Sequence, residues 1–156
     1  MTPVDHGVYL VSDSFFQQFP SSTWMQNKSE TRPHYYAVQD SSGLYWMIPM
    51  SSKVDKYRRK IQAEEAKHGV GNCVYYHLGN VYGRDSAFVI SGCFPVTEQY
   101  ILRGYEMYGA PVIVQNRRLN QELRSRVVRF IRLLEQHKLR DDNHVLNIRR
   151  ILLHTP

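Results

Sequence analysis

The stretch "RPHYYAVQDSSGLYWMIPMSSK" (residues 32–53) decides the fold, because it holds two β-rich segments around a glycine turn. "HYYAVQD" and "LYWMIPM" are rich in aromatic residues, and "SSG" (41–43) between them is typical of a β-hairpin. Two serines, Ser51 and Ser52, follow the second segment directly and precede the cationic run "KVDKYRRK" (53–60). The pattern predicts a strand that ends at two hydroxyls, where a helix begins.

Two interpretations of this serine pair remain open. In the first, Ser52 caps the helix together with Asp55 three residues later, and the cations form a solvated face. In the second, Ser51 and Ser52 join the free backbone N–H groups of the helix start in binding a phosphate. Lys53 and Lys56 would then add positive charge on one side of the same helix.

The segments on either side predict one α+β domain over residues 1–156. "HGVYLV" (6–11) is expected to be a strand, followed by a short helix that Ser12 caps and Pro20 ends. Further strands are expected at 72–78, 86–92 and 110–115, and helices after Ser52 as far as Gly69, after Thr97, at 119–139 and at 143–153. This order is typical of a mainly antiparallel sheet with inserted and appended helices.

The composition indicates a globular protein with an anionic partner. Hydrophobic residues make up 42% of the chain, and the net charge is +6 with a pI near 9.4. Such a charge suits nucleic acid, an anionic membrane surface or simple solubility. Cys73 and Cys93 lack a metal-binding or secretory spacing, and no apolar run reaches the ~20 residues of a membrane span. We therefore expect a cytoplasmic protein without a metal site or membrane anchor.

The segment 119–139, "LNQELRSRVVRFIRLLEQHKL", is expected to be an amphipathic helix with a basic outer face. The apolar side chains that recur with helical spacing are Leu119, Leu123, Val127, Phe130, Ile131 and Leu134. The basic face is either a solvated surface or a nucleic-acid contact. Acids are sparse there, which favours a nucleic-acid contact by Arg117, Arg118, Arg124 and Arg129.

The first strand of the hairpin places two more polar residues near the serines. Antiparallel pairing brings the first residue of one strand beside the last residue of its neighbour, so Arg32 and His34 should lie close to Ser51 and Ser52. Arg32 is expected to contact a flanking phosphate. His34 is either a surface residue of the strand or a secondary general acid.

The order of these segments resembles that of a known family. "GVYLVSDSFFQQF", "RPHYYAVQDSSGLYWMIPMSSK", "SAFVISGCFPVTEQYI" and then a basic helix resemble the toxins of type III toxin–antitoxin systems, the ToxN/AbiQ family, and most of all its CptN-like branch. The resemblance spans nearly the whole chain. It rests on an early tyrosine-bearing strand, Arg-Pro opening a strand, a proline two residues before the serine pair with a lysine after it, and a Pro-Val turn.

This resemblance implies a sequence-selective endoribonuclease that uses no metal or other cofactor, on a twisted, barrel-like antiparallel sheet. The family's tyrosine, hydroxyl pair and lysine match Tyr9, Ser51, Ser52 and Lys53. Many members carry a proline between the second hydroxyl residue and the lysine, and this chain does not. Lys53 and Lys56 therefore compete for the catalytic lysine's position, and Arg58 and Arg59 are expected to bind RNA beside it.

The implied reaction is attack of the RNA's own 2′-OH on the adjacent phosphorus, which leaves a 2′,3′-cyclic phosphate and a 5′-hydroxyl. The implied partners are cellular RNA as substrate and a repeated, folded RNA antitoxin as inhibitor, in an oligomeric protein–RNA assembly that serves phage defence. Two other classes remain open from the residues: a non-catalytic RNA- or DNA-binding module, and a basic protein whose terminal helices dock an acidic protein or a membrane.

Overall fold

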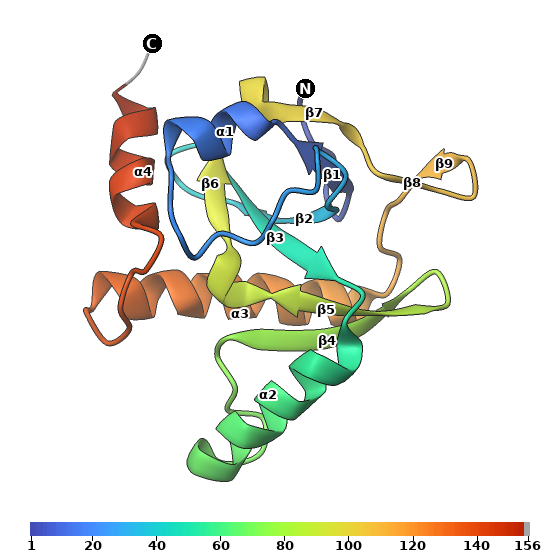
Figure 1. Cartoon of the computed structure of the whole chain (residues 1–156), viewed down its shortest axis with the longest axis vertical. Helices are drawn as coiled ribbons and strands as arrows, with labels where there is room; N and C mark the ends of the chain where they lie inside the picture. Colours follow the sequence, from blue (N-terminus) through green and yellow to red (C-terminus); the bar gives the residue numbers. More distant parts are fainter. Residues whose placement is uncertain (155–156) are drawn as a thin grey trace.

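The computed structural model describes residues 1–154, which form a twisted antiparallel sheet surrounded by helices (Figure 1). The strands are β1 (Val8–Val11), β2 (His34–Gln39), β3 (Tyr45–Ser51), β4 (Tyr76–Val81), β5 (Arg84–Val89), β6 (Phe94–Val96) and β7 (Ile101–Gly104). Their order is β4-β5-β3-β2-β1-β7, with β6 paired to β3. Over the described residues β4 and β7 remain edges, so the expectation of a barrel-like sheet was too strong: the sheet is open.

The predicted hairpin of β2 and β3 is confirmed, and these two strands form the centre of the sheet. Tyr35 lies opposite Ile48, and Gln39 lies opposite Tyr45. The turn between the strands is fixed by Asp40, whose carboxylate accepts hydrogen bonds from two backbone amides and from the buried indole of Trp46. A carboxylate that accepts several N–H donors stabilises a tight turn, and it fixes the register of both strands.

Strand β3 pairs with different partners along its length. Its first half pairs with β6, while its last two residues, Met50 and Ser51, pair with Phe88 and Ala87 of β5. The 3₁₀ turn η1 (Ile90–Gly92) separates β5 from β6 on this side of β3. The end of β3 is therefore enclosed between the start of β2 and the middle of β5.

Residues 1–154 contain four α-helices, which lie around the sheet. They are α1 (Asp13–Gln18), α2 (Val54–His68), α3 (Arg117–Glu135) and α4 (Val145–Leu153). Ser12 caps α1 as predicted, because its side chain accepts from the amide of Ser14. The apolar face predicted for α3 is buried against the sheet, and Asn120 adds a polar contact by accepting from the Tyr35 hydroxyl at 2.7 Å.

Helix α2 projects from the sheet at one end of the molecule (Figure 1). It is attached through the side chain of Tyr57, which is buried against Ala87 and Val89 of β5. Val54 and Ile61 are half-buried on either side of Tyr57, and Gly69 ends the helix as expected. None of the helices in residues 1–154 has the length and apolarity needed to cross a membrane.

Several predicted strands were displaced or missed. The strand expected at 72–78 begins at Tyr76, and a two-residue turn joins it directly to β5. The strand expected at 110–115 is reduced to β9 (Ala110–Pro111), which pairs only with β8 (Glu106–Met107). The short helix after Thr97 is confirmed as the 3₁₀ turn η2 (Glu98–Tyr100), but β6 and β7 on either side of it were not predicted.

Candidate active site

A cavity of about 320 Å³ opens where β3 ends. Several chain segments meet there: the loop before β2, the end of β3, the start of β5 and the segment after β7. The polar and charged residues that line it are Lys28, Thr31, Arg32, Ser51, Ser52, Arg84, Asp85, Ser86 and Tyr105. The predicted proximity of Arg32 to the serine pair is therefore found in the structure.

The two serines differ in what their hydroxyls bind. Ser51 accepts the backbone N–H of Lys53 at 3.2 Å. Helix α2 then begins at Val54 with Lys53 as its N-cap residue, and no side chain caps it. The capping interpretation of Ser52 was wrong: its hydroxyl forms no hydrogen bond with any residue from 1 to 154, and Asp55 pairs with Arg58 at 2.5 Å instead. The exposed oxygen of Ser52 is free to bind a ligand at the cavity wall.

Arg32 brings a nearly buried positive charge to the same cavity. Its side chain is 7% exposed, and it donates from Nη1 to the carbonyl of Met50 at 2.7 Å and from Nε to the carbonyl of Gln26 at 2.5 Å. Burial lowers its pKa, but a guanidinium remains protonated. No carboxylate of the described chain forms an ion pair with it. A desolvated cation without a counter-ion, on the wall of a cavity, is the arrangement that binds an anion.

The loop that carries Lys28 is held in an uncommon conformation. Three successive residues, Lys28, Ser29 and Glu30, have left-handed φ angles of 52°, 54° and 65°. Each such residue costs about 1–2 kcal/mol, so the surrounding contacts must stabilise the loop. The carboxylate of Glu30 accepts the amide of Asp13 at 2.8 Å, and Asn27 donates to the carbonyl of Val11 at 2.8 Å. These contacts keep Lys28 at the cavity.

His34 is placed differently from the prediction. It lies opposite Pro49, near the end of β3 as expected, but its side chain points into the core and is 1% exposed. Its Nδ1 donates to the carbonyl of Arg32 at 3.0 Å, and the rings of Phe16 and Phe94 pack against it. Burial lowers the pKa of His34 to about 3. Neither interpretation offered from the sequence, surface residue or general acid, fits this position.

Tyr9 also lies away from the cavity. Its ring folds back over Gly7, and its hydroxyl accepts the N–H of Val4 at 2.5 Å. Val8, the preceding residue of β1, lines the cavity instead, because successive side chains of a strand point to opposite faces. The tyrosine found at the cavity is Tyr105, whose amide donates to the carbonyl of Val8 at 2.8 Å.

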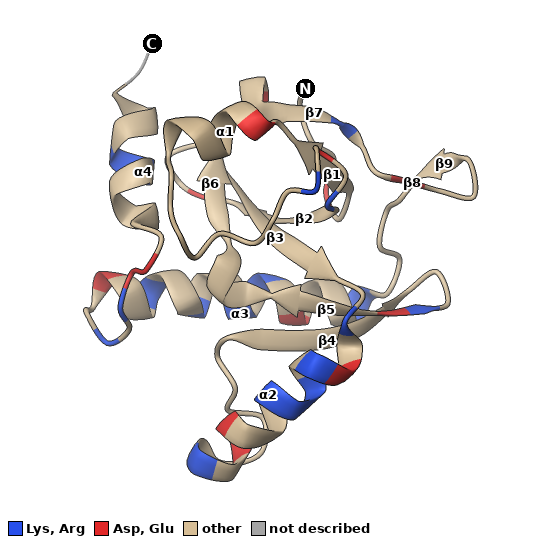
Figure 2. Ribbon diagram, in the orientation of Figure 1, with Lys and Arg blue, Asp and Glu red and all other residues tan. Residues whose placement is uncertain are grey.

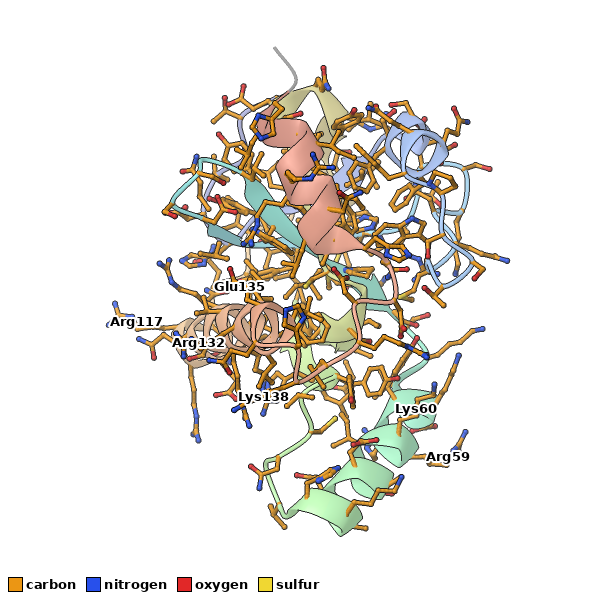
Figure 3. The ribbon with its side chains drawn as sticks, turned by 90° about the vertical axis from the view of Figure 1, so that its left-hand side faces the viewer. Arg59, Lys60, Arg117, Arg132, Glu135 and Lys138 are labelled. Atoms are coloured by element: carbon orange, nitrogen blue, oxygen red, sulfur yellow. The ribbon has the colours of Figure 1, made fainter. Side chains whose placement is uncertain are left out.

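The cations of α2 lie next to the cavity rather than in its wall. Lys53, Lys56, Arg58 and Arg59 are exposed on the first turns of the helix. The ammonium of Lys56 lies 5.4 Å from the ring centroid of Tyr57. Figure 3 shows Arg59 and Lys60 projecting from α2 into the surroundings of the molecule. Together these side chains form an exposed, positively charged surface on the first turns of α2.

A second basic surface runs along the outer face of α3. Arg124 and Arg129 line a groove of about 920 Å³ together with Arg126 and Arg132. Arg126 is fixed by the carboxylate of Glu122 at 2.8 Å and by the carbonyl of Cys73 at 2.7 Å. Figure 2 shows the concentration of basic residues on α2 and α3.

The two arginines at the start of α3 lie outside this groove. Arg118 lines a neighbouring cavity with His77, and Arg117 projects outward from the start of the helix (Figure 3). Both are exposed. Residues 1–154 contain no group of three or more His, Cys, Asp or Glu side chains that could hold a metal ion.

No sequence pattern points to several of the residues that line the cavity. Lys28, Thr31, Asp85 and Tyr105 come from loops or strand ends that no motif marks, and only the folded chain brings them to the serines. The hairpin pairing was the one signal that linked residues distant in sequence. It found Arg32 and could not find the others.

Comparison with known proteins supports the fold. No known protein-family profile and no curated protein matches the chain. Among solved structures, it is similar to AbiQ, a lactococcal anti-phage endoribonuclease of a type III toxin–antitoxin system, with a TM-score of 0.61 and 8% identity over 81% of each chain. It is also similar to a protein from a bacterial antiviral system that a processed non-coding RNA regulates, with a TM-score of 0.57 and 13% identity over 90% of this chain and 95% of that one. The predicted resemblance to the ToxN/AbiQ toxins is thereby confirmed: the chain has their fold.

Proposed function

We propose that this protein is an endoribonuclease toxin of a type III toxin–antitoxin system, and that it cuts RNA in the cavity at the end of β3. The observation that carries the proposal is the shared cavity wall of Arg32 and Ser52: within residues 1–154 the guanidinium of Arg32 forms no ion pair and the hydroxyl of Ser52 forms no hydrogen bond. Both groups donate hydrogen bonds, and a phosphodiester offers only acceptors. The fold shared with AbiQ supports the same function.

The proposed reaction needs no metal, because the RNA's own 2′-OH attacks the adjacent phosphorus. Negative charge then grows on the phosphorus-bound oxygens, and preorganised donors stabilise that charge more than they stabilise the ground state. Ser51, Ser52 and Arg32 are the donors of the cavity wall that serve this purpose. One well-placed donor of this kind contributes about 3 kcal/mol to lowering the barrier.

Two protons must move during the reaction, and two side chains of the cavity are suited to move them. Asp85 is the carboxylate of the cavity lining and can accept the proton of the 2′-OH. Lys28 can donate a proton to the departing 5′-oxygen. Lys53 and Lys56, which the sequence placed in the catalytic group, are assigned to the flanking phosphates together with Arg58 and Arg59.

The basic groove of α3 is proposed as the contact for the repeated RNA antitoxin. Arg124 and Arg129 line it with few acids nearby, and it is separate from the cavity at the end of β3. A folded RNA seated there and across the cavity mouth would block the substrate. The same groove favours a second candidate function, a non-catalytic RNA-binding module, in which the cavity only holds a phosphate.

Cleavage of mixed cellular RNA in excess EDTA distinguishes these functions. The wild-type protein should produce mapped cuts with 5′-hydroxyl and 2′,3′-cyclic phosphate ends, and a Ser51→Ala, Ser52→Ala double variant should lose them. A Ser22→Ala variant, altered at an exposed serine outside the cavity, is the matched control and should cut normally. If the wild-type protein binds RNA tightly and leaves it uncut, the ribonuclease is contradicted and the non-catalytic RNA-binding module is supported.

A further inference from the structure

Two hairpin tips meet at the mouth of the cavity. One is the turn Tyr82–Gly83 between β4 and β5, and the other is the turn Tyr108–Gly109 between β8 and β9. Both tyrosines have left-handed φ angles, 52° and 54°. Arg84 and Met107, which adjoin the two tips, line the cavity itself. Figure 1 shows both hairpins reaching the same side of the molecule.

The two tyrosines make different contacts. The hydroxyl of Tyr82 donates to the carbonyl of Ile113 at 2.8 Å and accepts its amide at 3.0 Å, so this side chain ties one hairpin to the segment that follows the other. Tyr108 is 77% exposed, and its hydroxyl forms no hydrogen bond within residues 1–154. The contact of its ring is with the guanidinium of Arg84, 5.8 Å from the ring centroid.

The position of Tyr108 needs an explanation beyond stability. A large ring that stays in water contributes little to folding, and a non-glycine residue with a positive φ costs about 1–2 kcal/mol. The flat guanidinium of Arg84 and the flat ring of Tyr108 are also the two kinds of surface on which RNA bases stack. Arg84 lines the cavity and Tyr108 directly follows Met107, which lines it too, so both flat groups lie at the edge of the cavity.

We propose that Tyr108, backed by Arg84, is the stacking platform for the base next to the phosphate bound in the cavity. Arg84 covers part of one face of the ring, and the exposed remainder accepts the base. Met107 lines the apolar side of the same site. The inference rests on the proposed function, because it adds a nucleotide subsite to the cavity where RNA is cut.

Equilibrium binding of short single-stranded RNA tests the subsite without cleavage. The probes are 2′-O-methyl oligonucleotides, which lack the nucleophile, each with one abasic position. Removing the base that stacks should weaken binding by about fivefold to a hundredfold. Tyr108→Ala should weaken binding of the intact probe equally, yet leave binding of that one abasic probe unchanged. Tyr108→Phe should bind as the wild type does, because stacking does not use the hydroxyl.

Arg84→Ala removes the group that backs the ring and should also weaken binding of the intact probe. Arg103→Ala is its charge control and should bind as the wild type does, since Arg103 is exposed on β7 outside the cavity. The proposal is overturned if Tyr108→Ala binds the intact probe as tightly as the wild type. It is also overturned if the binding loss caused by Tyr108→Ala and the loss caused by removing a base are additive at every abasic position in the probe.

The same variants separate this inference from the proposed function. If the wild type cuts RNA and Tyr108→Ala cuts it at the same rate and with the same nucleotide preference, the subsite is overturned and the proposed ribonuclease is not. A wild-type protein that cuts no RNA, but shows the coupled loss in binding, would overturn the ribonuclease and support the subsite as part of an RNA-binding surface.

Discussion

Arg32 is held by carbonyls from two different parts of the chain, Gln26 in the loop and Met50 in β3. A guanidinium carries five N–H donors in a fixed plane, so two of them can fix the side chain while others remain for a ligand. A lysine carries its three N–H donors on one nitrogen, so it could not place donors on two separate atoms as Nε and Nη1 of Arg32 do here. The residue therefore joins the loop to the sheet and brings a positive charge to the wall of the cavity.

His34 predicts a specific pH dependence of stability. Its pKa is about 3 in the folded protein because it is buried, against 6.5 when unfolded. A histidine whose pKa is lower in the folded protein contributes its full stability at a pH above its unfolded-state pKa. That contribution is lost as the pH falls from the unfolded-state pKa towards the folded-state pKa. At pH 5 the protein should therefore be about 2 kcal/mol less stable than at pH 7 through this residue alone.

Urea unfolding of the wild type and of His34→Asn at both pH values measures this effect. Asparagine keeps a donor for the carbonyl of Arg32 but does not titrate, so the variant should lose about 2 kcal/mol of the pH dependence. Burial lowers the pKa of His77 to about 4, so this residue adds the same pH dependence to the free energy of unfolding in both proteins. Equal pH dependence in the two proteins would show that His34 is not buried as described.

The side-chain directions of Tyr9 and His34 could not be read from the sequence. Alternation of polar and apolar residues reveals the faces of a strand only when one face meets water. All of β1 and the first five residues of β2 are buried, and their sequences carry no such alternation. The pairing of β2 with β3 was predictable because it depends on the turn, and it led correctly to Arg32.

At the scale of elements, Gly79 determines how closely α3 approaches β4. A Cβ built on Gly79 would lie 2.6 Å from Leu119 of α3 and 3.2 Å from Phe88. Gly79→Ala should lower the free energy of unfolding by about 1–3 kcal/mol, because the neighbouring buried side chains must shift. Urea denaturation measures the change.

The matched test combines this variant with Leu119→Ala, which alone should cost about 2–4 kcal/mol by leaving a cavity. In the double variant the new methyl group occupies part of that space, so the total loss should be smaller than the sum of the two. Strictly additive losses would mean that α3 does not pack on β4 at this point.

Long elements were predicted more accurately than short ones. The helix at 117–135 has many apolar side chains at helical spacing and the helix at 54–68 has three, and these patterns located both helices to within a few residues. Strands β6 and β7 have only three and four residues and are separated by a 3₁₀ turn. The turn at Tyr82–Gly83 was missed because its first residue is a tyrosine with a positive φ, which few sequences place there.

For the whole molecule, basic residues gather on α2 and α3 (Figure 2). The cavity lies where β3 ends. RNA held on these helices should therefore bind with a steep dependence on salt, because each neutralised phosphate releases counterions. Arg124→Ala and Arg129→Ala should each reduce the slope of log K against log salt by about 0.7 for single-stranded RNA. Arg103→Ala, on β7, is the control and should leave the slope unchanged. If the slope is unchanged in all three variants, α3 does not contact the phosphates of the bound RNA.

The most direct test of the cavity as the site of cleavage is single-turnover cleavage of one mapped RNA site by wild type, Ser52→Ala and Lys53→Ala. With protein in excess, the Ser52→Ala rate should fall about a hundredfold or more, because a donor to the reacting phosphate is lost. Lys53→Ala should weaken RNA binding and leave the saturated rate within a fewfold of wild type. A Ser52→Ala protein that cuts at the wild-type rate would contradict the account and move the chemistry away from the end of β3.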